Sequence, residues 1–132
     1  SALRSGVSGV PALAAYCLAA SGSPRAVEPM LLAMHEAIES REMAFAREVI
    51  RGLGRLARPE ATEALAELLL RKSLVNRKHL REIKVVAASA LGRIPGDEAV
   101  GALAQAAQSR DSQLRRAAQT ALDRRAKALT GG

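Results

Sequence analysis

Aromatic residues and cysteine are almost absent from this chain. Its 132 residues include one Tyr, one Phe, no Trp and one Cys. Scarce aromatic and β-branched residues disfavour strands. The single cysteine, Cys17, excludes an internal disulfide and a multi-cysteine metal site, and it is typical of a reducing compartment, so we expect a cytoplasmic protein. No apolar run approaches the ~20 residues that a membrane-spanning helix needs.

Alanine is abundant instead, with 28 positions. Ala, Leu, Arg and Glu are strong helix formers, and a composition of 48% hydrophobic and 25% charged residues is that of a folded domain rather than a disordered segment. We therefore expect an all-α fold and a single domain over residues 1–132.

Charge is distributed unevenly along the chain. Residues 1–70 contain seven basic and eight acidic side chains, whereas residues 71–132 contain thirteen basic and five acidic ones. The basic second half could attract acidic protein surfaces, nucleic acid or phospholipid, and charge alone does not choose among them.

Several stretches repeat one another at fixed offsets. Residues 52–61 (GLGRLARPEA) align with residues 90–99 (ALGRIPGDEA) at an offset of 38, which places Gly54 on Gly92. An offset of 35 adds an earlier copy, and an offset of 31 adds the first helix of a fourth copy. Repeats of this length are typical of stacked helical units.

Each copy has the pattern of two amphipathic helices joined by a short turn. Met43, Ala46, Ile50 and Leu53 recur at steps of three and four, which is the apolar stripe of a helix. We expect helices over residues 11–20, 27–39, 41–57, 61–71, 81–94, 97–109 and 112–129.

The aligned positions also predict packing. Glycine inside a helix costs about 1 kcal/mol relative to Ala, so the matched Gly54 and Gly92 indicate close helix approach. The leucines at matched apolar positions should be buried: Leu53, Leu65, Leu91 and Leu103.

The Leu-Gly-Arg-Leu/Ile segment, the short Pro/Asp-Glu-Ala turn and the Leu-rich second helix resemble bacterial HEAT repeats and the HEAT-like repeats of phycobilin lyases. The resemblance covers nearly the whole chain, most strongly residues 41–129. It implies an α-α superhelix, a HEAT-like solenoid of about three and a half antiparallel helix pairs, with first helices on the convex side and second helices on the concave side. Such solenoids usually serve protein–protein contacts, so we expect a scaffold for an unknown protein partner.

The start of the chain suggests a fragment of a longer protein. It opens with Ser1 rather than Met, and its first copy is weakly marked. Uncapped end repeats would expose apolar residues around Val10, Leu13 and Leu18, so we expect weak self-association there.

An acidic run follows the turn of the second copy. Glu60, Glu63 and Glu67 share one helix face at spacings of three and four. Carboxylates early in a helix also favour its dipole and solubility. The run is therefore either a solvated face or, on a concave surface, a patch that receives a basic partner segment.

A basic cluster interrupts the repeats. Residues 72–80 form an expected nine-residue loop between helix pairs. The basic residues in and beside it are Arg71, Lys72, Arg77, Lys78, Arg81 and Lys84. This loop is either a solvated spacer or a site for an acidic protein segment or phosphates. The alternative function is a nucleic-acid or anionic-lipid binding module, although no aromatic residue here could stack on a base.

No catalytic or metal-binding pattern emerges. His35 and His79 have no set of further ligands at metal-binding spacing, and Cys17 has no nearby His to activate it. Some HEAT-like proteins are DNA glycosylases, but those enzymes frame the lesion with aromatic residues, and this chain has no Trp. We therefore expect no enzymatic activity, no cofactor and no metal.

Overall fold

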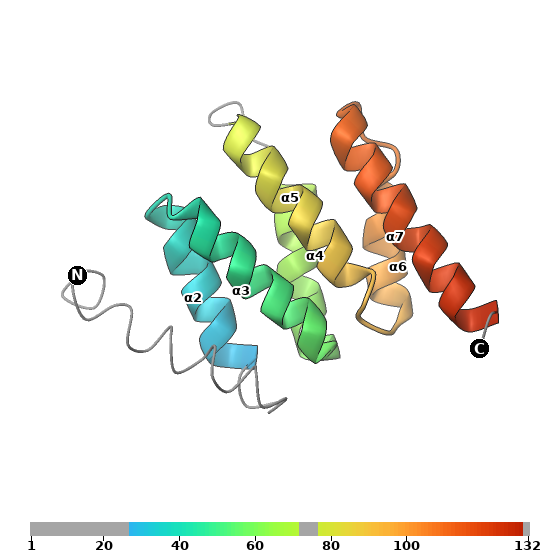
Figure 1. Cartoon of the computed structure of the whole chain (residues 1–132), viewed down its shortest axis with the longest axis horizontal. Coiled ribbons are helices and arrows are strands. Elements are labelled where there is room, and N and C mark those ends of the chain that lie inside the picture. The colour runs from blue at the N-terminus through green and yellow to red at the C-terminus, as the bar shows by residue number, and fades with distance from the viewer. Residues whose placement is uncertain (1–26, 72–76, 131–132) are drawn as a thin grey trace.

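The computed structural model describes residues 27–71 and 77–130, and the regular structure in these ranges is entirely helical. The elements are α2 (Val27–Glu39), α3 (Met43–Leu56), the short 3-10 helix η3 (Pro59–Ala61), α4 (Thr62–Leu70), α5 (Arg77–Leu91), α6 (Asp97–Ala106) and α7 (Ser112–Thr130). Figure 1 shows them stacked in order along the molecule. The expected all-α class is confirmed.

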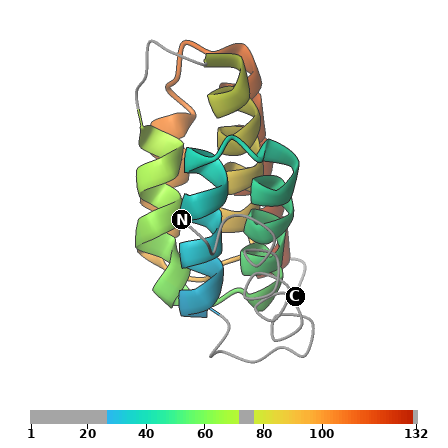
Figure 2. The same ribbon diagram turned by 90° about the vertical axis from the view of Figure 1, so that its left-hand side faces the viewer.

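The helices form two layers. Figure 1 shows α3, α5 and α7 side by side, and Figure 2 shows α2 and α4 on the opposite side of the stack. We call α3, α5 and α7 the first layer, and α2, α4 and α6 the second layer. In the first layer α5 packs against both α3 and α7, and in the second layer α4 packs against α6. Each unit therefore contacts its neighbours in the stack, as in other repeat proteins.

Contacts between the layers pair α2 with α3, α4 with α5, and α6 with α7. The sequence copies instead group α3 with α4 and α5 with α6. The two groupings differ because each second-layer helix lies closest to the first-layer helix that follows it along the chain.

Most expected helices match the observed ones apart from a few residues at their ends, and α2 coincides with the expected residues 27–39. The expected loop over residues 72–80 is wrong in its second half, because α5 begins at Arg77. Arg, Lys and Leu favour helices, and half-buried Leu80 extends the apolar stripe of buried Ile83 by one helical step. The expected helix over residues 11–20 and the apolar residues near it lie outside the described ranges.

The core lies between the two layers and is built from Leu, Ile, Met and Ala. Its fully buried large side chains are Met30, Met34, Ile50, Leu53, Leu65, Leu68, Leu69, Ile83, Leu91, Ile94 and Leu103. Burying one such side chain contributes about 1.5–3 kcal/mol. All four leucines expected to be buried are in this set, so that prediction is confirmed.

The matched glycines lie where consecutive first-layer helices meet. A Cβ on Gly54 would lie 2.9 Å from the Cα of Ala90 in α5, and a Cβ on Gly92 would lie 2.9 Å from the Cβ of Ala121 in α7. The same contact therefore recurs in two successive units. It confirms the expected close packing and explains why α3 contains glycine despite its cost in a helix.

Candidate interaction surfaces

The three glutamates of the acidic run are exposed, with Glu60 in η3 and Glu63 and Glu67 in α4. Glu60 accepts a hydrogen bond from Nε of Arg58 at 3.1 Å. The Oε1 atom of Glu67 lies 3.7 Å from Nη2 of Arg71, and the Glu67 side chain remains 71% exposed. Exposed ion pairs of this kind are weak, so all three carboxylates are accessible to a partner.

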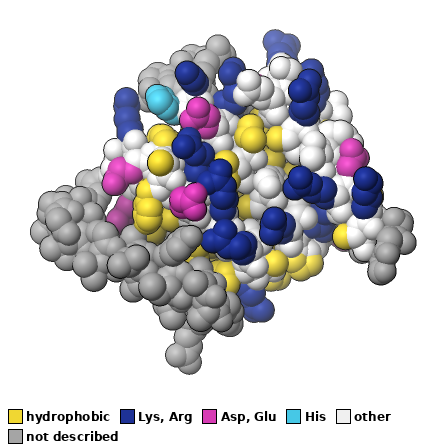
Figure 3. Space-filling model, in the orientation of Figure 1, with side chains coloured by type: hydrophobic (Ala, Val, Ile, Leu, Met, Phe, Trp, Pro, Cys, Tyr) yellow, Lys and Arg dark blue, Asp and Glu magenta, His cyan; other side chains and the backbone are white. Residues whose placement is uncertain are grey.

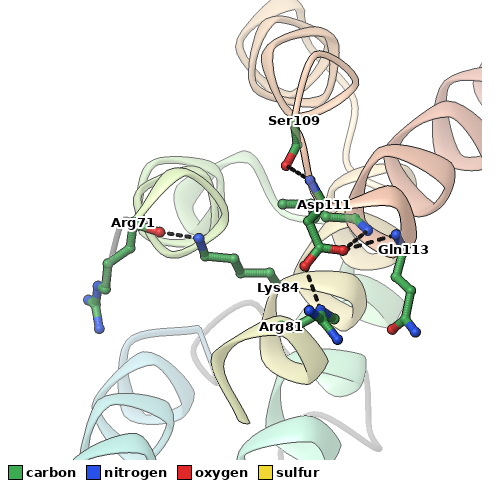
Figure 4. A network of polar contacts seen from close by, with 7 residues as sticks. Arg71, Arg81, Lys84, Ser109, Asp111 and Gln113 are labelled. Atoms are coloured by element: carbon green, nitrogen blue, oxygen red, sulfur yellow. Dashed lines mark hydrogen bonds and ion pairs between the residues drawn. The ribbon is translucent and has the colours of Figure 1, made fainter. Parts of the chain in front are cut away.

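Part of the basic cluster holds the helices together. The Nζ of Lys84 donates to the backbone carbonyl of Arg71, at the end of α4. The Nε of Arg81 donates to Oδ2 of Asp111 at 2.5 Å. Figure 4 shows how these contacts link α4 to α5 and α5 to the start of α7. Arg81 and Lys84 therefore have structural partners, in addition to any role in binding.

The remaining members of the basic cluster are placed differently. Lys78 is exposed on the first turn of α5. Lys72 and the side chain of Arg77 lie outside the described part of the structure. A binding role for the cluster as a whole therefore stays a prediction.

Asp111 caps α7 and receives Arg81 at the same time. Its Oδ1 accepts the backbone N–H groups of Gln113 at 2.9 Å and Leu114 at 3.2 Å, which satisfies donors that a helix start leaves unpaired. Burial by itself raises the pKa of Asp111, but the hydrogen bonds from Arg81, Leu114 and Gln113 outweigh this effect and hold the pKa below the ordinary 3.8. The ionised carboxylate is therefore part of the fold.

The two layers carry opposite charge. The second-layer helices contain no basic residue and these acidic ones: Glu28, Glu36 and Glu39 in α2, Glu63 and Glu67 in α4, and Asp97 and Glu98 in α6. The first-layer helices contain three acidic residues, Glu48, Glu82 and Asp123, and these basic ones: Arg47, Arg51, Arg55, Arg77, Lys78, Arg81, Lys84, Arg115, Arg116, Arg124, Arg125 and Lys127. Figure 3 shows Lys and Arg side chains spread over the first-layer face. The two layers of the fold therefore differ in net charge, in addition to the difference between the two halves of the sequence.

A groove of about 800 Å³ lies between α5 and α7 in the first layer. Val85, Ala117 and Ala121 supply apolar surface to it, and no acidic side chain lines it. Three exposed arginines also line it: Arg93, Arg116 and Arg124. None of these three arginines belongs to the basic cluster predicted from the sequence.

A partial signal for the groove does exist in the sequence. Arg116 and Arg124 are eight residues apart, so they share one face of α7. That spacing indicates a basic stripe but cannot reveal which helix forms the opposite wall. The groove appears only when α5 and α7 are brought together.

No metal-binding group is found among residues 27–71 and 77–130, because their His, Asp and Glu side chains form no suitable cluster. His35 in α2 and His79 in α5 are both exposed, and Cys17 lies outside these residues. In the same ranges, none of the helices combines the length and apolar character needed to cross a membrane.

A family model of the PBS lyase HEAT-like repeat matches residues 45–71. The matched residues cover most of α3, then η3, and all of α4, which is one helix pair of the sequence repeat. No curated protein matches the chain. The matched helix pair, the offset copies around it and the two-layer stack of helices together show an α-helical repeat fold that contains a HEAT-like repeat.

Proposed function

We propose that the chain is a non-catalytic scaffold that binds another protein through its second layer. The charge separation between the layers carries this proposal, because α2, α4 and α6 together contain seven carboxylates and no basic residue. Such a surface has a negative field that attracts a basic partner segment. HEAT-like repeats are often used for protein interaction, which agrees with this role. The single cysteine supports a cytoplasmic setting.

Glu60, Glu63 and Glu67 are the contacts that we propose on this layer. All three are exposed, so a partner can reach them without any change in the core. An exposed ion pair contributes at most about 1 kcal/mol, and complementary charge improves partner choice and association rate more than affinity. A partner must therefore use several carboxylates together and add apolar contacts of its own.

The alternative function is a nucleic-acid or anionic-lipid binding module that acts through the basic second half. The gathering of twelve basic residues in the first-layer helices favours it. The residues lining the α5–α7 groove include no aromatic side chain, so base stacking is not offered there. Phosphate binding would weaken steeply between about 50 and 200 mM salt, because counterions are released on binding.

The test is affinity capture from a nuclease-treated lysate, comparing the parent chain with a Glu63→Lys/Glu67→Lys variant. We expect the variant to lose the captured proteins, because it reverses the exposed charge of α4. Glu48→Lys/Asp123→Lys is the matched control, since it makes the same change in net charge on exposed positions of the first layer. The control should retain the partners.

Two results would contradict the proposal. In the first, both variants retain every partner, which would remove the second layer from the contact. In the second, nuclease abolishes capture while a 20-base-pair DNA duplex or vesicles containing phosphatidylserine bind the parent with a steep salt dependence. That second result would establish the alternative function.

A further inference from the structure

The arginines of the α5–α7 groove lack anionic partners among the residues that the structure describes. The side chains of Arg93, Arg116 and Arg124 make no ion pair or hydrogen bond with these residues. The neighbouring Arg125 behaves differently, because its guanidinium donates to the carbonyl oxygens of Leu91 and Gly96. Three guanidinium groups therefore remain available at the groove, and carboxylates and phosphates are both well-matched ligands for them.

The groove also has an apolar component. Val85, Ala117 and Ala121 contribute apolar surface between the two helices. Arg116 and Arg124 are eight residues apart on α7, which is about 12 Å along a helix axis. A fitting ligand therefore presents an apolar group between two carboxylates that are about two helical turns apart.

The outer face of α2 has this pattern. Among the described residues, Leu32 is the only large hydrophobic residue that is exposed to solvent, with an exposed fraction of 62%. Glu28 and Glu36 lie one turn before and one turn after it, so they are also eight residues apart. Glu28 is exposed and Glu36 is partly exposed. The α2 face thus matches the groove in charge, in spacing and in its central apolar group.

We propose that the α2 face of one copy, formed by Glu28, Leu32 and Glu36, docks into the α5–α7 groove of a second copy. The inference deepens the proposed function and rests on it, because it names the groove as one basic partner of the acidic second layer. Leu32 covers the apolar surface of the groove, and the two glutamates pair with Arg116 and Arg124. The contact joins two different surfaces, so a pair of copies keeps a free groove on one copy and a free α2 face on the other, and assembly continues head to tail.

A second copy fits the groove better than a polyanion does. A nucleic acid offers phosphates but no protruding aliphatic side chain of the size of Leu for Val85, Ala117 and Ala121, and the groove lacks an aromatic side chain on which a base could stack. The α2 face supplies carboxylates and an aliphatic side chain together. The rest of the second layer is acidic and the rest of the first layer is basic, so the surfaces beside the docked helix also attract each other.

The experiment is sedimentation of the 132-residue chain and two charge-reversed variants. The groove variant is Arg116→Glu/Arg124→Glu, and the α2 variant is Glu28→Lys/Glu36→Lys. We expect the parent to self-associate in a concentration-dependent manner and each variant alone to associate at least tenfold more weakly. An equimolar mixture of the two variants should recover association, because each reversed surface then meets its complement.

Further variants separate this contact from general charge effects. Leu32→Ser keeps every charge and should weaken self-association at least fivefold. Glu63→Lys/Glu67→Lys changes the net charge as the α2 variant does but leaves α2 intact, so it should weaken association far less than the α2 variant does. Circular dichroism of each variant checks that the helices are formed.

A parent chain that stays monomeric up to about 1 mM would overturn the inference, since that limit corresponds to a binding free energy weaker than about −4 kcal/mol. Failure of the mixed variants to associate would overturn it as well, even if the parent associates, because another surface would then be responsible. Binding of the DNA duplex with loss of binding in the groove variant alone would assign the groove to a polyanion instead. In each case the proposed function stands if Glu63→Lys/Glu67→Lys still loses the captured partners.

Discussion

Gly54 in α3 directly faces the backbone of Ala90 in α5. A methyl group on Gly54 would lie 2.9 Å from the Cα of Ala90 and 3.1 Å from its Cβ. Real side chains do not pack this closely against backbone, so the two helices can approach only because residue 54 has no side chain. The distance between successive units of the repeat thus depends on one missing methyl group.

We predict that Gly54→Ala destabilises the fold by up to about 2 kcal/mol, because overpacking against the backbone of Ala90 costs up to about 3 kcal/mol and the helix-propensity gain offsets only about 1 kcal/mol of it. Urea unfolding followed by circular dichroism measures the change. Gly101→Ala in α6 is the control, since a Cβ there meets nothing within 4 Å, and it should stabilise by about 0.4–1 kcal/mol. Equal stabilisation by both substitutions would show that α3 and α5 are farther apart.

Leu91 is fully buried at the end of α5. Leu91→Ala should lower the free energy of unfolding by about 2–5 kcal/mol, because it removes buried apolar surface and leaves a cavity. Leu32→Ala should change it by less than about 0.5 kcal/mol, because that side chain is mainly in solvent. The pair is compared by thermal and urea denaturation at a protein concentration where both variants are monomeric. Similar values for the two would place Leu91 outside the core.

Arg125 satisfies the carbonyl end of α5 from the next first-layer helix. Its Nη2 donates to the carbonyl of Gly96 at 3.2 Å, and its Nη1 donates to the carbonyl of Leu91 at 3.5 Å and to that of Ile94. Arg125→Ala leaves these partly buried acceptors without this donor, so we expect a loss of about 1–3 kcal/mol. The neighbouring exposed Arg124→Ala should cost less than about 0.5 kcal/mol. If Arg125→Ala and Arg124→Ala lower the free energy of unfolding by equal and small amounts in urea, then water replaces Arg125 as the hydrogen-bond donor to these carbonyls.

Asp111 gives the stability a defined pH dependence. Its pKa is depressed in the folded chain, so the stability that its charge contributes is complete above the ordinary value of 3.8 and is lost as pH falls through the lower folded value. Asp111→Asn keeps a capping side chain but cannot ionise. We therefore expect the variant to be less stable than the parent at neutral pH and the difference to shrink toward pH 2.

Urea midpoints measured between about pH 2 and 7 test this expectation for Asp111. Asp123→Asn serves as the control, because Asp123 is an exposed carboxylate of the same helix that contacts only Gln119 among the described residues. Its pH profile should follow that of the parent. A constant difference between parent and Asp111→Asn at every pH would show that the Arg81 contact does not depend on the carboxylate charge.

The helical class, the helix of residues 27–39 and the burial of the four matched leucines could all be predicted from the sequence. Each depends on local spacing, because an apolar stripe at steps of three and four defines both a helix and its buried face. The sequence predicts the start of α5 too late for a related reason. A run of basic residues favours a loop, although Arg77–Leu80 continue the same helical period.

The candidate surfaces could be predicted only in part. Glu60, Glu63 and Glu67 stand out because they are close together in the sequence, at spacings of three and four. The groove arginines do not stand out, since Arg93 is separated from Arg116 by the whole of α6 and the turns before and after it. Arg81 is a different case, because a residue expected to bind a ligand also pairs with Asp111, thirty positions away, and this contact could not be predicted from the sequence.

The sequence by itself determined that this chain is a stack of amphipathic helices, because periodicity and helix propensity act over a few residues. Only the tertiary structure decided how charge is arranged, because alternate helices go to opposite layers and carry their side chains with them. It also decided that a groove exists between α5 and α7, since the close contact of Gly92 with Ala121 sets how the two helices meet. Distances of that kind depend on which side chains pack together, and no single helix contains that information.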